Sequence, residues 1–223
     1  MGVRIVRLRR SAAAGVLVTV AVLAAAACSG HSASTFTPEG GGSASAGGQA
    51  SSGDVSSPGY VMPPFGSNVH IDMTSWVPTD TSQAAAANAD KSYELAYLYA
   101  EYKGGQDESW VNYVSPVMKT AVQQSLQGND VTTESFTGTI KYFDMSVIVD
   151  PLVKGDLDVS TCFDNAGSSN TDITTGKVIP DTSSPDSHYV RISDELRKNS
   201  AGQWQVVSSL PPVYYPQAKQ CKP

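Results

Sequence analysis

Residues 136–163 have the sequence FTGTIKYFDMSVIVDPLVKGDLDVSTCF. Over 136–150 and again over 155–163, apolar and polar side chains alternate with a period of two, which is typical of strands with one buried face. In the first segment one face carries Phe143, Met145, Val147 and Val149, and the other carries Ile140, Tyr142, Asp144, Ser146 and Ile148. The stretch therefore predicts two strands of one antiparallel sheet.

The strand pattern returns after a polar interval. Residues 164–187 are rich in Asp, Asn, Ser, Thr and Gly, with a short KVI at 177–179, and are expected to form a long loop. Residues 188–198 and 203–210 alternate again and are joined by Asn-Ser-Ala-Gly at 199–202, which predicts a hairpin.

Helical patterns precede the strands. Ser82 is a plausible N-cap for a helix that runs to about Tyr102 and is apolar nearly all round, with Gly104 and Gly105 ending it. Asp107 begins a shorter helix, and Ser115-Pro116 has the N-cap and N1 residues of a third helix that ends near Gly128. Helices followed by strands predict an α+β domain, with the helices on one face of a curved antiparallel sheet.

The N-terminus has the composition of an export signal. Four arginines lie within residues 4–10, and the 16 residues from 12 to 27 are almost entirely apolar. This run is shorter than the roughly 20 residues that cross a bilayer as a helix, so residues 1–27 are interpreted as a signal peptide. The remaining chain carries 11 basic and 21 acidic residues, a net charge of −10, which argues against binding of nucleic acid or anionic lipid.

The residues before Cys28 resemble the lipobox of bacterial lipoproteins. The sequence is Ala-Ala-Ala-Cys at 25–28, and it departs from the usual pattern because Ala25 stands where the box usually has Leu. The resemblance implies that Cys28 is lipidated and holds the protein on the outer face of the cytoplasmic membrane. The alternative is ordinary cleavage, which leaves a free thiol at Cys28.

The mature chain is expected to have three parts. Residues 28–58 form a tether, because Ser29–Pro58 contains 9 Ser, 7 Gly and 4 Ala in 30 residues and cannot bury enough apolar surface to fold. Residues 59–80 are richer in apolar groups and contain Pro63, Pro64 and Pro78, which predicts an extended arm on the edge of the domain. Residues 81–223 form the folded domain.

Cysteine number suggests a disulfide. If Cys28 is acylated, Cys162 and Cys221 remain as an even pair in an exported protein, which favours a bond between them. The alternatives are a metal site or a reactive thiol, for which the sequence shows neither a CxxC motif nor a histidine at ligand spacing. No metal and no cofactor is predicted.

The domain resembles the NTF2-like (cystatin-like, cone-shaped) superfamily, and most closely its secreted and lipid-anchored actinobacterial members. The resemblance covers roughly Thr79 to Cys221. It rests on YELAYLYAEY at 93–102, DLDVSTCFDN at 156–165, TTGKVI at 174–179, NSAGQWQVV at 199–207 and the C-terminal Cys221. It implies a curved sheet whose concave face and helices enclose a pocket.

Two acids interrupt apolar strand faces and are candidates for that pocket. Asp144 lies beside Tyr142 in the alternation of the first strand, and Asp194 lies between Ile192 and Leu196. A carboxyl group on a dry concave face can act as a general base or a ligand anchor. The alternative, which we favour, is that a bulge turns each acid to solvent or that a nearby arginine neutralises it.

Three functions follow from these observations. The sequence contains no HExxH, GxSxG, SxxK or Gly-rich phosphate loop, so no catalytic residue is predicted. The first expectation is therefore a non-catalytic lipoprotein that binds a small apolar ligand or a protein partner. The second is a scaffold subunit of an envelope secretion or conjugation assembly. The third is an NTF2-like isomerase or cyclase that uses Asp144, Asp194 or Tyr142.

Overall fold

The computed structural model describes residues 61, 64–73 and 78–222, so the predicted signal peptide, Cys28 and the tether lie outside the described residues. The elements in chain order are β1 (Val69–Met73), α1 (Thr81–Tyr102), η1 (Ser109–Tyr113), α2 (Pro116–Leu126), α3 (Asn129–Thr133), β2 (Glu134–Val149), β3 (Leu157–Asp172), η2 (Pro185–His188), β4 (Tyr189–Lys198), β5 (Trp204–Ser209), β6 (Val213–Tyr214) and η3 (Lys219–Cys221). In the described part of the chain, no helix has both the length and the apolar composition needed to cross a membrane.

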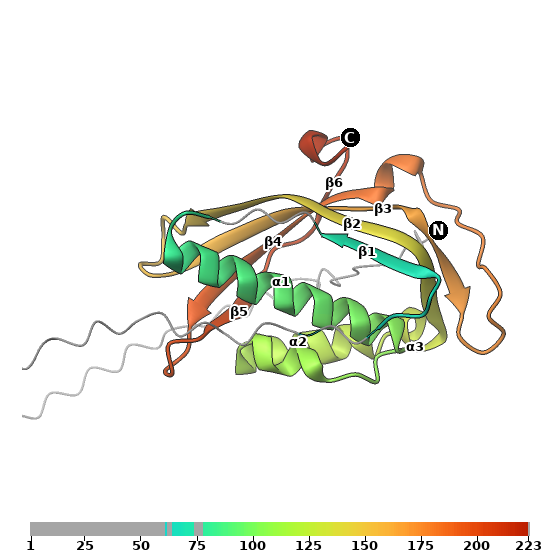
Figure 1. The fold of residues 1–223 in the computed structure, drawn as a ribbon, viewed down its shortest axis with the longest axis horizontal. Coiled ribbons are helices and arrows are strands. Elements are labelled where there is room, and N and C mark those ends of the chain that lie inside the picture. Colours follow the sequence, from blue (N-terminus) through green and yellow to red (C-terminus); the bar gives the residue numbers. More distant parts are fainter. Residues whose placement is uncertain (1–60, 62–63, 74–77, 223) are drawn as a thin grey trace, which may run out of the picture.

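The strands form one curved sheet with the order β1-β2-β3-β4-β5, and β6 pairs with the beginning of β4 at Val190 and Arg191. All neighbours are antiparallel except β1, which runs parallel to β2 at the edge of the sheet. Figure 1 shows α1 lying along one face of this sheet, with α2 and α3 beside it. The predicted α+β architecture, with the helices on one face of a curved sheet, is confirmed.

The ends of the first helix are set by local chemistry. Asp80, rather than the predicted Ser82, is the N-cap of α1, because its carboxylate accepts a hydrogen bond of 2.9 Å from the Gln83 amide. Gly105 follows the helix with φ of +78°. A Cβ there would lie 2.3 Å from the carbonyl oxygen of Leu126, so this close approach to α2 requires glycine.

The core lies between α1 and the sheet. The helix is buried on nearly all sides, as its composition predicted, with Tyr93, Tyr97 and Leu98 each at 1% exposure. The even-numbered residues of β4 and the odd-numbered residues of β3 face α1, because cross-strand partners such as Leu157 and Leu196 share a face of the sheet.

Two strand predictions are corrected by the register. Pairing between β2 and β3 shifts from Phe143–Cys162 to Ser146–Ser160, which leaves one extra residue in β2 and makes a bulge. Asp144 sits in this bulge with φ of +51° and is exposed, while Tyr142 before it and Val147 after it are both buried. The bulge therefore reverses the alternation that the sequence predicted for the second half of β2.

The predicted loop at 164–187 is also too long. β3 continues to Asp172, because its polar second half pairs with the beginning of β2 from Thr139 to Glu134. Backbone pairing needs no apolar side chain, so the composition of this segment concealed a strand.

The C-terminal tail is fixed by the disulfide that the cysteine count predicted. Cys162 on β3 and Cys221 in η3 are bonded, with their Cα atoms 5.1 Å apart. Cys221 and Ala218 are fully buried against this side of the sheet, where Phe143 and Tyr189 cover them. The prediction of a Cys162–Cys221 disulfide is confirmed.

Candidate functional site

The three pocket candidates from the sequence do not form one group. Tyr142 and Asp194 are buried on the face of the sheet that α1 covers, whereas Asp144 is exposed at the bulge. Tyr142 packs on Phe163, with their ring centroids 5.1 Å apart, and Phe163 pairs with Val190. Asp194 lies four residues further along β4, about 13 Å away along the strand.

Asp194 instead meets two acids of α1. Asp90 and Glu94 are separated by four residues, so their side chains lie on one side of the helix. One carboxylate oxygen from each of Asp90, Glu94 and Asp194 lies within 4.8 Å of the other two. All three residues are only 2% exposed. Of the two alternatives favoured for these acids, a turn to solvent at a bulge applies to Asp144 and not to Asp194, which is buried.

The charges of this carboxylate cluster oppose one another. At 4.8 Å and an effective dielectric constant of about 20, two ionised carboxylates repel by about 3.5 kcal/mol. A proton shared between two of the groups removes this repulsion, as in carboxylate pairs that cannot both ionise. Asp90, Glu94 and Asp194 are therefore a candidate acid–base group on the grounds of their burial and spacing.

A cation would also offset the charge. Calcium takes oxygen ligands at 2.3–2.6 Å, so two ligands of one ion lie at most about 5 Å apart, and the spacing of the carboxylate cluster is within that limit. Asp90, Glu94 and Asp194 are thus the residues of the described chain that could hold a metal ion. The sequence prediction named no metal site.

Two hydroxyl groups border the cluster on the sheet. Ser209 on β5 is the cross-strand partner of Asp194, so both side chains lie on the face that α1 covers. Thr161 lies on the same face of β3, two residues after Val159, which is the cross-strand partner of Asp194. The hydroxyl oxygens of Ser209 and Thr161 are buried and make no hydrogen bond within the described residues.

Sequence reasoning missed Asp90 and Glu94. Both residues lie in a helix that was interpreted as apolar nearly all round, so neither was considered as a site residue. The available signal was the pair of acids at i and i+4 in a helix whose other sides are alanine, leucine and tyrosine. That spacing predicts a shared direction for the two side chains, but not that Asp194 lies opposite them.

A second polar group lies on the opposite face of β4. Arg197 Nε lies 2.9 Å from both carboxylate oxygens of Asp156, and Arg197 Nη2 lies 3.5 Å from Glu195 Oε1. The hydrogen bonds from Arg197 lower the pKa of Asp156, and the Asp156 carboxylate in turn raises the pKa of Arg197. The pKa of Glu195 is raised, first by its side-chain hydrogen bond with Asp156 and then by burial.

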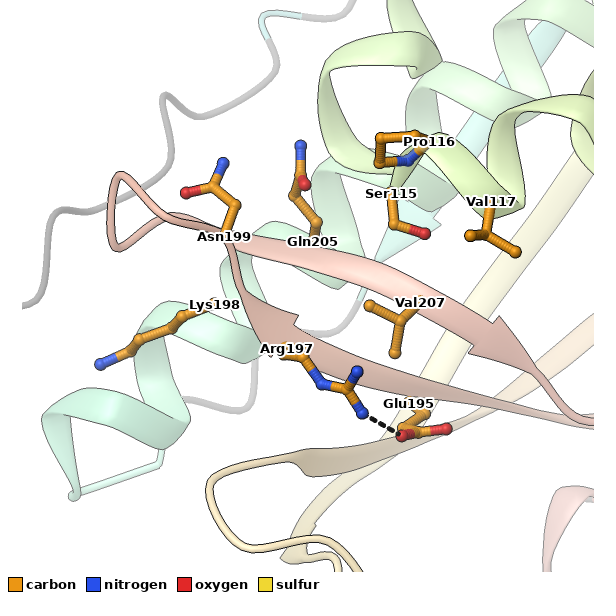
Figure 2. Close-up of a pocket in the computed structure, with 9 residues that line it drawn as sticks. All are labelled: Ser115, Pro116, Val117, Glu195, Arg197, Lys198, Asn199, Gln205 and Val207. Atoms are coloured by element: carbon orange, nitrogen blue, oxygen red, sulfur yellow. Dashed lines mark hydrogen bonds and ion pairs between the residues drawn. The ribbon is translucent and has the colours of Figure 1, made fainter. Parts of the chain in front are cut away.

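This group borders a hollow of about 460 Å³, shown in Figure 2. The first residues of α2 form one side, and β4, β5 and the turn between them form the other. The lining residues are Ser115, Pro116, Val117, Glu195, Arg197, Lys198, Asn199, Gln205 and Val207.

Comparisons with known proteins give structural likenesses but no family. No protein-family model matches the chain, and no curated protein matches it. A solved structure described as a ketosteroid isomerase-like protein from Erwinia carotovora atroseptica is similar, with 16% identity and a TM-score of 0.35. The alignment covers 60% of this chain and 99% of that chain.

The expectation of a non-enzymatic protein is corrected by these findings. The similar solved structure carries the name of an isomerase-like protein. The structure also brings Asp90, Glu94 and Asp194 together, and these are the ionisable groups that the sequence interpretation did not combine.

Proposed function

We propose that the protein is a lipid-anchored, extracytoplasmic enzyme that moves a proton on a small apolar substrate. The observation that carries this proposal is the buried carboxylate cluster of Asp90, Glu94 and Asp194, whose oxygens lie within 4.8 Å of one another. Buried ionisable groups in close contact are the usual source of acids and bases whose proton affinity suits catalysis. The reaction class is isomerisation by proton transfer next to a carbonyl group.

The roles follow from the composition of the cluster. An ionised carboxylate, which we assign to Asp194, takes a proton from the carbon beside the carbonyl, and the electron pair of that C–H bond moves into an enolate. Glu94 or Asp90, holding the shared proton, donates a hydrogen bond to the developing oxyanion. The proton then returns from Asp194 to a different carbon, so the reaction is balanced and needs no oxidant or reductant.

The surroundings of the cluster favour an apolar substrate. Tyr93 and Tyr97 on α1 are buried at 1% exposure, and their ring centroids lie 6.0 Å apart. Leu196, two residues after Asp194 on β4, and its cross-strand partner Val206 are fully buried on the face that α1 covers. Apolar side chains combined with a few polar groups are typical of small-molecule sites, which is why we propose an apolar substrate.

Membrane attachment is the second element of the proposal. It is supported by the basic residues 4–10, the apolar run 12–27 and the lipobox-like residues before Cys28. The test is the intact mass of protein extracted from its own membrane. Extra mass on Cys28 is expected, and replacement by Cys28→Ala should release the protein; an unmodified Cys28 would contradict the anchor.

Proton transfer can be tested without knowing the substrate. The protein is incubated in deuterated water with a panel of small cyclic ketones, including β,γ-unsaturated ones, and deuterium incorporation is followed by NMR. We expect Asp194→Asn to lower the incorporation rate by about 100-fold or more, the usual contribution of a general base. The matched control is Asp144→Asn, which changes an exposed acid of the same sheet and should have no effect.

Two results would contradict the proposal. One is deuterium incorporation no faster than in buffer for every ketone of the panel. The other is equal rates for the unchanged protein and the Asp194→Asn variant. Circular dichroism of each variant shows whether a lost rate reflects a lost fold.

A further inference from the structure

The hollow beside α2 is separate from the carboxylate cluster. Glu195 and Arg197 alternate along β4 with Asp194 and Leu196, so their side chains lie on the opposite face of the sheet. A volume of about 460 Å³ is in the range of small-molecule sites. Its lining therefore determines what kind of molecule can occupy it.

One edge of the hollow is a fixed set of hydrogen-bonding groups. Arg197 is held by Asp156 and Glu195, which fixes the plane of its guanidinium group. Its Nη1 nitrogen has no hydrogen bond within the described residues, and the side chain is 50% exposed. Gln205 is the cross-strand partner of Arg197. In Figure 2 the two side chains extend in opposite directions, the guanidinium of Arg197 toward Glu195 and the amide of Gln205 toward the beginning of α2.

The charge of this edge is nearly balanced. Asp156 offsets the charge of Arg197 at close range. Lys198 extends away from the other lining side chains in Figure 2 and places its ammonium group 5.1 Å from the ring centroid of Trp204. A strongly charged ligand would therefore gain little net attraction, whereas a neutral ligand can use both the donors and the Glu195 acceptor.

The other side of the hollow is apolar. Pro116 and Val117 begin α2, and Val207 lies in β5 across from them. Val117 is 82% exposed, an unusual degree for a large apolar side chain, and it faces the polar edge across the hollow. A ligand must accordingly have hydroxyl or amide groups on one edge and C–H groups on its face.

We propose that this hollow binds an uncharged sugar unit of a glycan. A sugar hydroxyl both donates and accepts, so hydroxyls at one end of the hollow can accept from Arg197 and donate to Glu195, while a hydroxyl at the other end bonds the amide of Gln205. The C–H face of the ring then packs on Val117 and Val207. This site is independent of the proposed proton transfer, because no lining residue belongs to the carboxylate cluster.

The test measures binding of uncharged tetrasaccharides by titration calorimetry and saturation-transfer NMR. The probes are tetrasaccharides of glucose, mannose, galactose and N-acetylglucosamine at millimolar concentration, added to the mature protein in detergent. We expect saturable binding of at least one probe, and a loss of about three- to tenfold in affinity in Gln205→Ala, the effect of removing one hydrogen-bonding side chain.

A second variant guards against misfolding. Val117→Asp removes the apolar contact, and an acid in the first turn of α2 stabilises the helix, so a loss of binding cannot come from unfolding of α2. The matched controls are Gln217→Ala in the C-terminal tail and Val178→Asp, both at exposed positions away from the hollow, and both should bind within twofold of the unchanged protein.

Three outcomes would overturn the proposal. The first is the absence of saturable binding for all four probes. The second is binding that Gln205→Ala and Val117→Asp leave within twofold of the unchanged protein. The third is binding of uncharged tetrapeptides in place of the sugars, which would assign the hollow to a peptide partner.

Discussion

Removal of the Cys162–Cys221 disulfide should be the most costly change to the C-terminal tail. The perturbation is the double variant Cys162→Ala with Cys221→Ala. The two cysteines are 59 residues apart, and the chain-entropy model for a loop of that length gives about 4 kcal/mol as an upper value. We expect a loss of about 2–4 kcal/mol in the free energy of unfolding, because the tail keeps part of its packing through Ala218.

The assay is guanidinium chloride unfolding, followed by tryptophan fluorescence and circular dichroism. With a denaturant dependence of about 4 kcal/mol per molar, the expected loss moves the midpoint by about 0.5–1 M. Reduction of the unchanged protein should give the same midpoint as the double variant, and reductant should not alter the variant.

A midpoint shift equivalent to less than about 1 kcal/mol would refute this reasoning. It would mean that the tail is held mainly by side-chain contacts, such as the 2.7 Å ion pair between Lys222 and Asp186. The pKa of Lys222 is raised, first by its hydrogen bond with Asp186, so that contact is present at neutral pH. The disulfide would then be only one of several supports of equal weight.

Three further predictions test the sheet. Arg197→Leu should lower the free energy of unfolding at neutral pH, because Asp156 stays buried without its counter-charge. The pKa of Asp156 is lowered in the folded protein, so the stability that this group contributes is present above the ordinary carboxyl pKa near 4 and is lost as the pH falls through the lowered pKa. The difference in stability between Arg197→Leu and the unchanged protein should therefore shrink in acid. Urea unfolding at several pH values measures it. Gly138→Ala should lower the free energy of unfolding by more than 2 kcal/mol in thermal unfolding, because φ is +95° and the new Cβ would lie 2.2 Å from a carbonyl oxygen of β3. Its control is Gly176→Ala, where no atom lies within 4 Å of the new Cβ and the loss should be about 1 kcal/mol. Asp144→Gly should raise the melting temperature by a few degrees, because glycine adopts the φ of +51° without strain.

Each of these predictions has a clear contrary result. A pH-independent cost of Arg197→Leu would show that the arginine acts through packing and not through charge. Equal costs at Gly138 and Gly176 would show that the strand pair can move apart at the glycine contact. A lower melting temperature for Asp144→Gly would mean that the flexibility glycine adds to the unfolded chain outweighs the relief of strain.

The sequence was most informative where structure is set locally. The period of two in 188–198 and 203–210 predicted the β4–β5 hairpin, and the residues Ser115-Pro116 predicted the beginning of α2, where Ser115 accepts a hydrogen bond from the Met118 amide. The cysteine count predicted the disulfide. These predictions succeeded because each depends on neighbouring residues or on a simple pairing rule.

The candidate site was predicted only in part. Asp194 was singled out because it interrupts an apolar face, and it does belong to the carboxylate cluster. Its partners were missed, because the rotation of α1 about its axis and its position along the sheet decide which helix residues meet β4. Asp144 was grouped with Tyr142 because a sequence shows alternation but not a bulge.

The sequence by itself determined the order of helices and strands, the α+β class and the pairing of Cys162 with Cys221, because hydrophobic period, caps and cysteine number are written in the chain. It also supports the predicted export and lipid attachment at Cys28. Only the tertiary structure decided that Asp90 and Glu94 face Asp194, and that Arg197 and Gln205 line one hollow with the beginning of α2. Such contacts depend on strand register, on one extra residue in β2 and on how a helix sits across a sheet, and these are collective properties of packing that no short stretch of sequence contains.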